Sequence, residues 1–516
     1  MRKFYLNLMR NKKEMYAILL ASILIIIIIT SMTPLSIDSW NLINSIKANL
    51  KTIDYRLYPG VGLGLELLFR GINSDFEFEF RYFIIAILSS IALIILITFI
   101  LQRYYFANAH TAITIGLFTY LMGPFQLGGL YWDYFYLIPI LGLVILINEL
   151  SGGNEKINLI YSSLSGILVG YLLIGKQNAA TLPLLYLIII SICTSRISDL
   201  KKLTIVVIFF IASLSLIGEE TQLINMSMLT DHLTIPFRYS VQTSIDTTGV
   251  YYRTIYRLFP LYYAYKFSIQ SFAFYIYGFF QLLIIILVFK RILTFIYNAE
   301  LPFNYTIRDS RLFMTVSIVG IYFINIITLG RNWPEISTLA PIVTYILFNS
   351  NSKNIEYSKI NKILIGFSIV FYSVCTVIPL RNYIKIYINE YERPYGLFVF
   401  GAYATGDYIN LKEIMKLIAS KHCVGGIGAT VSPLLYLGHM HCSHLIHLEH
   451  SIKSRNISYE SIVETMQIKN SIFIDSCFKD NNCFLKKSFE GAKVNDFIVD
   501  AKKIYITENI DLYISN

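Results

Sequence analysis

Charged residues are scarce in this sequence. Asp, Glu, Lys and Arg together make up 15% of the 516 residues, whereas hydrophobic residues make up 55%. A soluble chain of this length needs more charge on its surface, so the composition excludes an ordinary water-soluble globular protein. Residues 16–33 and 83–101 contain no charge. Each run is long enough to cross the ~30 Å hydrocarbon core of a bilayer as a helix, so both are predicted spans.

A signal-peptide cleavage site is also missing. No small-residue Ala-x-Ala pattern follows Met32, so the first apolar run is predicted to be a retained first helix. The formal net charge is +10, but Lys and Arg are dispersed at the ends of apolar runs rather than gathered in one patch. That distribution is typical of topology signals. It argues against nucleic acid as a partner, and membrane lipid is expected around the chain.

Alternate threading of the apolar runs from a basic, cytoplasmic N-terminus predicts about eleven spanning helices in residues 1–380. The first outer loop covers residues 34–81, and a longer outer segment covers residues 219–266. One predicted pair of spans covers residues 158–175 and then a helix that ends at Arg196, with Lys176 at the outer edge of the membrane between them. The localisation expected is a multi-pass protein of the plasma or inner membrane.

Residues 381–516 have the mixed composition of a globular domain and are predicted to lie on the non-cytoplasmic side. Alternating runs at residues 397–403 and 471–474 predict strands, and residues 411–420 predict an amphipathic helix. The fold class is therefore membrane all-α followed by a mixed α/β domain. Four of the six cysteines lie in this domain: Cys423, Cys442, Cys477 and Cys483. One or two disulfides of unassigned connectivity fit an oxidising compartment.

Four ionisable residues fall at one predicted depth, the outer membrane edge: Asp38, Asp133, Lys176 and Arg331. Charged groups at such positions need pairing or a wet cavity, which makes them candidate site residues. Lys and Arg would neutralise a phosphate, and a carboxylate would take a proton from an attacking hydroxyl or amine. For each residue alone, snorkelling or helix capping is the alternative.

Several short segments resemble the GT-C superfamily of glycosyltransferases, within it the protein O-mannosyltransferase and aminoarabinose transferase group (glycosyltransferase family 39-like). The first is an outer loop that opens with Asp38 and continues to Tyr58-Pro59-Gly60-Val61-Gly62-Leu63. The other two are the segment from Gly170 to Lys176 and the segment from Arg331 to Pro341. The resemblance implies an inverting transfer from a polyprenyl-phosphate-linked monosaccharide to a lipid, glycan or protein acceptor on the outer face.

The resemblance also implies residue roles. Asp38 would be the catalytic base and Asp133 the second acidic residue, while Lys176 and Arg331 would contact the donor phosphate. A lone Asp38 stands where many members carry an adjacent acidic pair, and Asp54 is its rival; Tyr58 is a further candidate. The sequence contains no Trp-Trp-Asp signature, which disfavours transfer of a preassembled glycan to Asn.

Two clusters keep alternatives open. Arg253 and Arg257, among tyrosines of the segment 219–266, could reach the donor phosphate, although an interfacial belt of Tyr and Arg explains most of that segment. Residues 439–450 hold five of the eight histidines and could bind zinc, but structural-zinc spacing with paired Cys is missing and a solvated cluster is favoured. No cofactor is implied firmly, and a divalent metal is compatible with the site.

The runner-up function is a lipid-linked glycan transporter or an envelope polysaccharide polymerase. A transporter more often shows paired inverted repeats, and no internal repeat is evident in the sequence. The arginines of residues 238–257 keep the polymerase alternative open.

Overall fold

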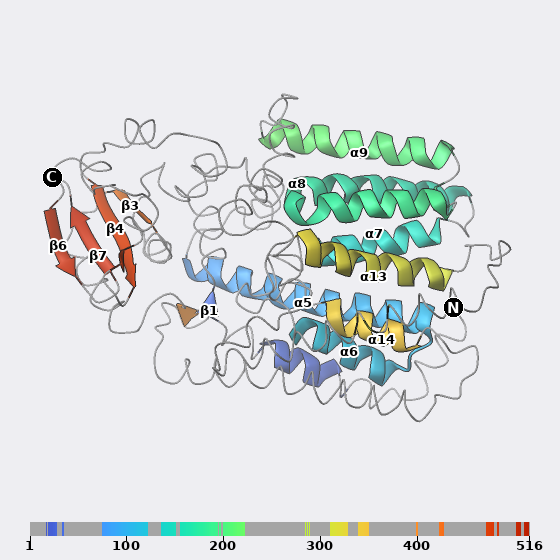
Figure 1. The fold of residues 1–516 in the computed structure, drawn as a ribbon, viewed down its shortest axis with the longest axis horizontal. Coiled ribbons are helices and arrows are strands. Elements are labelled where there is room, and N and C mark those ends of the chain that lie inside the picture. Colours follow the sequence, from blue (N-terminus) through green and yellow to red (C-terminus); the bar gives the residue numbers. More distant parts are fainter. Residues whose placement is uncertain are drawn as a thin grey trace.

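The structure is a computed structural model. It describes residues 17, 19–27, 34–35, 75–121, 136–150, 155–194, 196–197, 200–221, 284, 286, 288, 310–328, 339–349, 399–400, 423–427, 471–478, 482–483, 502–506 and 510–514. The helices are α5 (Asp75–Tyr105), α6 (Ala109–Leu121), α7 (Ile138–Glu149), α8 (Glu155–Cys193), α9 (Leu200–Thr221), α13 (Ser310–Thr328) and α14 (Ala340–Asn349). They lie side by side as one bundle (Figure 1). The described residues are therefore mostly helical, as predicted.

Two of these helices are long and apolar enough to cross a membrane, Phe80–Tyr105 and Glu155–Leu173. Only 50% and 28% of their apolar windows are buried inside the protein, which differs from the buried core helix of a soluble protein. Large apolar side chains are exposed on these helices and on α9: Leu88, Ile95, Leu159, Ile160, Ile208 and Ile211. Exposed apolar side chains of this kind are typical of helices that contact lipid. The predicted total of eleven spans extends beyond the described residues.

Serine and threonine hydroxyls inside the helices are satisfied locally. Each of the following donates a hydrogen bond to the carbonyl oxygen four residues before it: Ser89, Ser90, Thr119, Ser163, Thr204 and Thr344. A polar group that faces hydrocarbon or a dry core needs such a partner, because no water is available there.

Helix α8 folds back on itself. A straight helix of 39 residues would be about 58 Å long. Both of its ends nevertheless lie near the end of α7, because Arg196, just past α8, donates to the Asn148 carbonyl, and Glu155 starts α8 six residues after Glu149. Figure 1 accordingly shows α8 no longer than its neighbours. The two antiparallel halves agree with the predicted pair of spans.

The backbone between the two halves differs from the prediction. Lys176 was expected at the outer edge between two separate helices, whereas the structure includes it among the helical residues of α8, from Glu155 to Cys193. The reversal falls between Gly170, which packs on Ser213 of α9, and Tyr186, which packs on Gly320 of α13.

The first half of α8 packs closely on α9 through glycine. A Cβ atom built on Gly166 would lie 2.4 Å from the Val206 carbonyl oxygen, and one on Gly170 would lie 1.9 Å from Ser213 Oγ. Gly166 and Gly170 form a Gly-x-x-x-Gly spacing, which places both on one helix face and lets two backbones approach. We call this contact the glycine seam.

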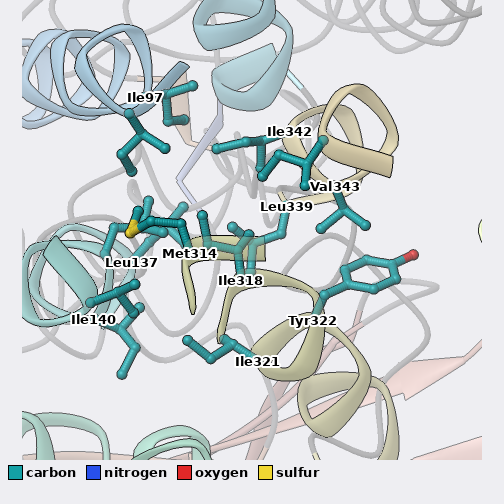
Figure 2. Close-up of a cluster of buried hydrophobic side chains, with 14 of the residues drawn as sticks. Ile97, Leu137, Ile140, Met314, Ile318, Ile321, Tyr322, Leu339, Ile342 and Val343 are labelled. Carbon is teal, nitrogen blue, oxygen red and sulfur yellow. The ribbon is translucent and has the colours of Figure 1, made fainter. Parts of the chain in front are cut away.

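The apolar core lies where α5, α7, α13 and α14 meet. Figure 2 shows Ile97 of α5, Leu137 and Ile140 at α7, Met314 and Ile318 of α13, and Ile342 of α14 pointing toward one another. All belong to one buried cluster. The cluster fixes α13 against α7, and this arrangement positions the polar residues at the end of α13.

The C-terminal region forms a sheet in the order β3 (Cys423–Ile427), β4 (Ser471–Phe478), β7 (Ile510–Ile514) and β6 (Lys502–Ile506), with β5 (Asn482–Cys483) also paired to β4. The β3–β4 pair is parallel, and the β4–β7, β6–β7 and β4–β5 pairs are antiparallel. The predicted strand at residues 471–474 is confirmed within β4. The predicted helix at residues 411–420 lies outside the described residues.

A two-residue strand joins distant parts of the chain. β1 (Pro34–Leu35) pairs in parallel with β2 (Val399–Phe400), which lies inside the predicted strand at residues 397–403. β1 begins the predicted first outer loop, and β2 belongs to the predicted outer domain. Figure 1 shows the sheet beyond the end of the bundle at which α5 begins. Segments predicted to share one side of the membrane therefore lie at one end of the bundle.

Candidate functional site

Basic residues gather at one end of the bundle. This basic end comprises the end of α5, the end of α7, both ends of α8, and the starts of α9 and α13. It carries Arg103, Lys156, Arg196, Lys201, Lys202 and Arg311, together with the acidic residues Glu149 and Glu155. Side-chain contacts that join these helix ends define it: Tyr105 with Thr315, Arg196 with Asn148, Lys201 with Glu155, and Lys202 with Leu150.

At the opposite end of the bundle, acidic residues outnumber basic residues among the described helix positions. It contains the start of α5, the start of α7, the reversal of α8, and the ends of α9 and α13. Acidic positions there are Asp75, Glu77, Glu79, Glu219 and Glu220, and basic positions are Arg81 and Lys176. Lys176 is therefore separated from the cations of the basic end by the length of the bundle.

Along the axis of the bundle, Lys176 lies near the end of α13. It precedes Tyr186 by ten residues, or at most about 15 Å of helix, in the direction away from the basic end. Tyr186 packs on Gly320 of α13 and donates to the Val316 carbonyl oxygen at 2.8 Å. From Gly320, α13 continues another eight residues to Thr328, or about 12 Å. Lys176 and the last turn of α13 thus occupy the same end.

The remaining site residues predicted from the sequence lie outside the described residues: Asp38, Asp54, Tyr58, Asp133, Arg253, Arg257 and Arg331. Three of them adjoin described residues in the sequence. Asp38 follows Leu35 of β1 by three residues, Asp133 precedes Tyr136 by three, and Arg331 follows Thr328 of α13 by three. The histidine run at residues 439–450 is also outside.

A buried polar pair that the sequence analysis missed lies at this opposite end. The Tyr136 hydroxyl donates a 2.8 Å hydrogen bond to Asn325 Oδ1, and both residues are fully buried. The bond ties the segment that enters α7 to the last turns of α13. An asparagine in the apolar sequence Ile324-Asn325-Ile326 was the available signal, because buried amides need partners.

Two polar atoms next to this pair find no hydrogen-bond partner among the described residues. They are Asn325 Nδ2 and the Tyr322 hydroxyl, which lies one helical turn deeper. Figure 2 shows the Tyr322 hydroxyl pointing away from the aliphatic cluster. A buried group without a partner costs about 1–3 kcal/mol. The opposite end of the bundle therefore contains two buried polar groups near the end of α13.

The contacts of the basic end, by contrast, are structural. Arg196 is fully buried, donates from Nη1 to the Asn148 carbonyl oxygen at 3.1 Å, and lies 5.5 Å above the Phe313 ring. The Tyr104 hydroxyl donates to Glu149 Oε1 at 2.6 Å, and Arg103 lies 4.0 Å from the same oxygen. Each contact joins the ends of different helices.

Arg196→Met is expected to lower the free energy of unfolding by about 2–3 kcal/mol, because it removes a buried charged donor and a cation–π contact. Glu155→Gln is the matched control. It removes the Lys201–Glu155 pair, whose side chains are 66% and 79% exposed, and is expected to cost less than about 1 kcal/mol. Thermal unfolding of both variants in detergent measures the difference. Equal losses would contradict the structural role of Arg196.

Among the residues that the structure describes, no cluster of three or more His, Cys, Asp or Glu side chains could hold a metal ion. Tyr322 and Asn325 of α13 are buried hydrogen-bonding residues at the end of the bundle opposite the basic end.

Comparison of the chain with protein-family models, with curated proteins and with solved structures finds no match.

Proposed function

We propose that this chain is an integral membrane glycosyltransferase that moves one monosaccharide from a polyprenyl-phosphate donor to an acceptor at the outer face of the membrane. The observation that carries the proposal is the separation of Lys176 from the basic end of the bundle. By the positive-inside rule the basic end is cytoplasmic, so Lys176 belongs to the outer face, with the sheet on the same side.

The chain connections support one shared site. Asp133 and Arg331 are each three residues in the sequence from described neighbours, Tyr136 and Thr328, which lie at the opposite end of the bundle. The hydrogen bond between Tyr136 and Asn325 holds their two anchoring segments together.

The proposed reaction is a direct displacement. Asp38 takes the proton of an acceptor hydroxyl or amine while that atom forms a bond to the anomeric carbon of the sugar. The bond between the anomeric carbon and the phosphate oxygen breaks at the opposite face, and polyprenyl phosphate leaves with both electrons of that bond. Lys176 and Arg331 neutralise the charge of the departing phosphate, with Asp133 as the second acidic residue. The sugar configuration inverts.

Lys176→Gln is expected to raise the KM for a polyprenyl-phosphate sugar by about 10-fold or more, because a charge-assisted hydrogen bond is worth about 1.5–3 kcal/mol. Transfer is measured in isolated membranes with a labelled donor. Lys201→Gln is the matched control, since Lys201 is an exposed lysine at the basic end, and we expect its KM to equal that of the wild type.

Two results would refute the proposal. One is a wild-type chain that transfers no sugar from any polyprenyl-phosphate monosaccharide yet moves an intact lipid-linked glycan across vesicles, which would identify a transporter. The other is an equal effect of Lys176→Gln and Lys201→Gln, because a phosphate site at the outer end cannot depend on both ends alike.

A further inference from the structure

The strand register restricts the pairing of the cysteines in the C-terminal region. On β4 and β5, Cys477 and Cys483 are directly opposed residues of an antiparallel ladder, and Phe478 opposes Asn482 next to them. Directly opposed residues leave such a ladder on the same face. Their Cα atoms are about 4.5 or 5.5 Å apart, depending on the kind of pair. Both values lie inside the ~4.4–6.8 Å range that a disulfide requires.

The same register excludes Cys423 as a partner of either residue. Cys423 opposes Ser471 at the start of the parallel β3–β4 pair. Cys477 lies six residues further along β4, which corresponds to about 20 Å of strand. Cys483 lies opposite Cys477 and is therefore also about 15 Å or more from Cys423 by the same spacing. Cysteines whose Cα atoms are more than about 7 Å apart cannot be bridged.

Four cysteines allow three complete pairings. Two of the three join Cys423 to Cys477 or Cys483, and the register excludes both. We infer that Cys477 and Cys483 form a disulfide across the β4–β5 hairpin. The choice of partner cysteines rests on the strand register alone. Oxidation of the two thiols also rests on the proposed function, which places the sheet on the outer side of the membrane.

Formation of the bridge consumes one equivalent of oxidant. The two thiols lose two protons and two electrons as the sulfur–sulfur bond forms. A disulfide of a thiol–disulfide oxidoreductase in the outer compartment accepts both electrons and protons and becomes a dithiol. A cytoplasmic sheet would remain reduced, because cytosolic thiols are kept in that state.

Peptide mapping of the full-length protein tests the inference. Free thiols are blocked with N-ethylmaleimide in native membranes, and the protein is then digested with trypsin without reductant. Cleavage after Lys479 separates the two cysteines into peptides 470–479 and 480–486, while Cys423 and Cys442 share peptide 422–453. We expect peptides 470–479 and 480–486 as one linked species that reduction separates. Cys477→Ser should abolish that species.

Cys193, a free and exposed cysteine of α8, is the internal control and should carry the maleimide. A species that links peptide 422–453 to either hairpin peptide would overturn the inference. So would N-ethylmaleimide on both Cys477 and Cys483. In that second case, the membranes are treated with diamide. If peptides 470–479 and 480–486 become linked only after this treatment, the strand register is right and the outer position of the sheet is wrong.

Discussion

Gly166→Leu is expected to leave no folded protein in the membrane, and Gly166→Ala is expected to lower the free energy of unfolding by about 1–3 kcal/mol. A Cβ atom at this position would lie 2.4 Å from the Val206 carbonyl oxygen and 3.0 Å from the Phe210 backbone nitrogen. An ordinary carbon–oxygen contact is about 3.3–3.6 Å, so α8 and α9 must separate by about 1 Å even for alanine. Backbone atoms cannot rotate away as a side chain can.

Gly142→Ala is the matched control for this prediction. Its Cβ atom would meet only Leu168 Cδ1, at an ordinary distance of 3.8 Å. The substitution also replaces glycine by alanine inside a helix, which favours folding by up to about 1 kcal/mol. Fluorescence-detected gel filtration and thermal unfolding in detergent measure both variants. Equal melting temperatures for Gly166→Ala and the wild type would show that α8 and α9 are not packed through the glycine seam.

Asp38→Asn is expected to reduce the rate of sugar transfer by about 10²–10⁴-fold, the usual contribution of a general base. Asparagine has nearly the shape of aspartate but cannot take the proton from the acceptor. The KM for the donor should change little, because Asp38 is proposed to act on the acceptor rather than on the phosphate. Single-turnover transfer in membranes containing equal amounts of each variant measures this effect on the chemical step.

Asp54→Asn is the control, because Asp54 is the rival acidic residue of the same predicted loop. It should retain most of the transfer rate if Asp38 is the base. The reverse outcome, full activity in Asp38→Asn and loss in Asp54→Asn, would move the base to Asp54 while leaving the transferase proposal intact. Full activity in both variants would exclude a base from this part of the first outer loop.

The helices of the bundle were largely predictable from the sequence. Charge-free runs flanked by charged residues predict the apolar middle of α5, α9 and the two halves of α8, because a bilayer excludes charge from long apolar segments. The start of α5 was not predicted, since this helix begins at Asp75, inside the predicted outer loop 34–81. Lys176 was predicted at the outer membrane edge, and its place within the helical residues of α8 did not follow from the sequence, since the preceding Gly175 also suits a turn.

The packing partners of particular residues were not predictable. Gly170 was interpreted as part of a motif that leads to Lys176, whereas the structure assigns it to the glycine seam against Ser213. Arg196 was interpreted as a topology signal at a helix end, yet its side chain is fully buried between Asn148 and Phe313. A span boundary depends on the composition of one segment, but such contacts depend on which two helices lie side by side.

The sequence by itself indicated the long apolar helices of the chain and the charged residues at their ends. These properties follow from the transfer of single segments between water and lipid, which composition controls. Only the tertiary structure decided the glycine seam, the bond between Tyr136 and Asn325, and the opposition of Cys477 to Cys483. Each of these joins residues from separate segments, and their distance depends on packing and strand register rather than on the composition of either segment.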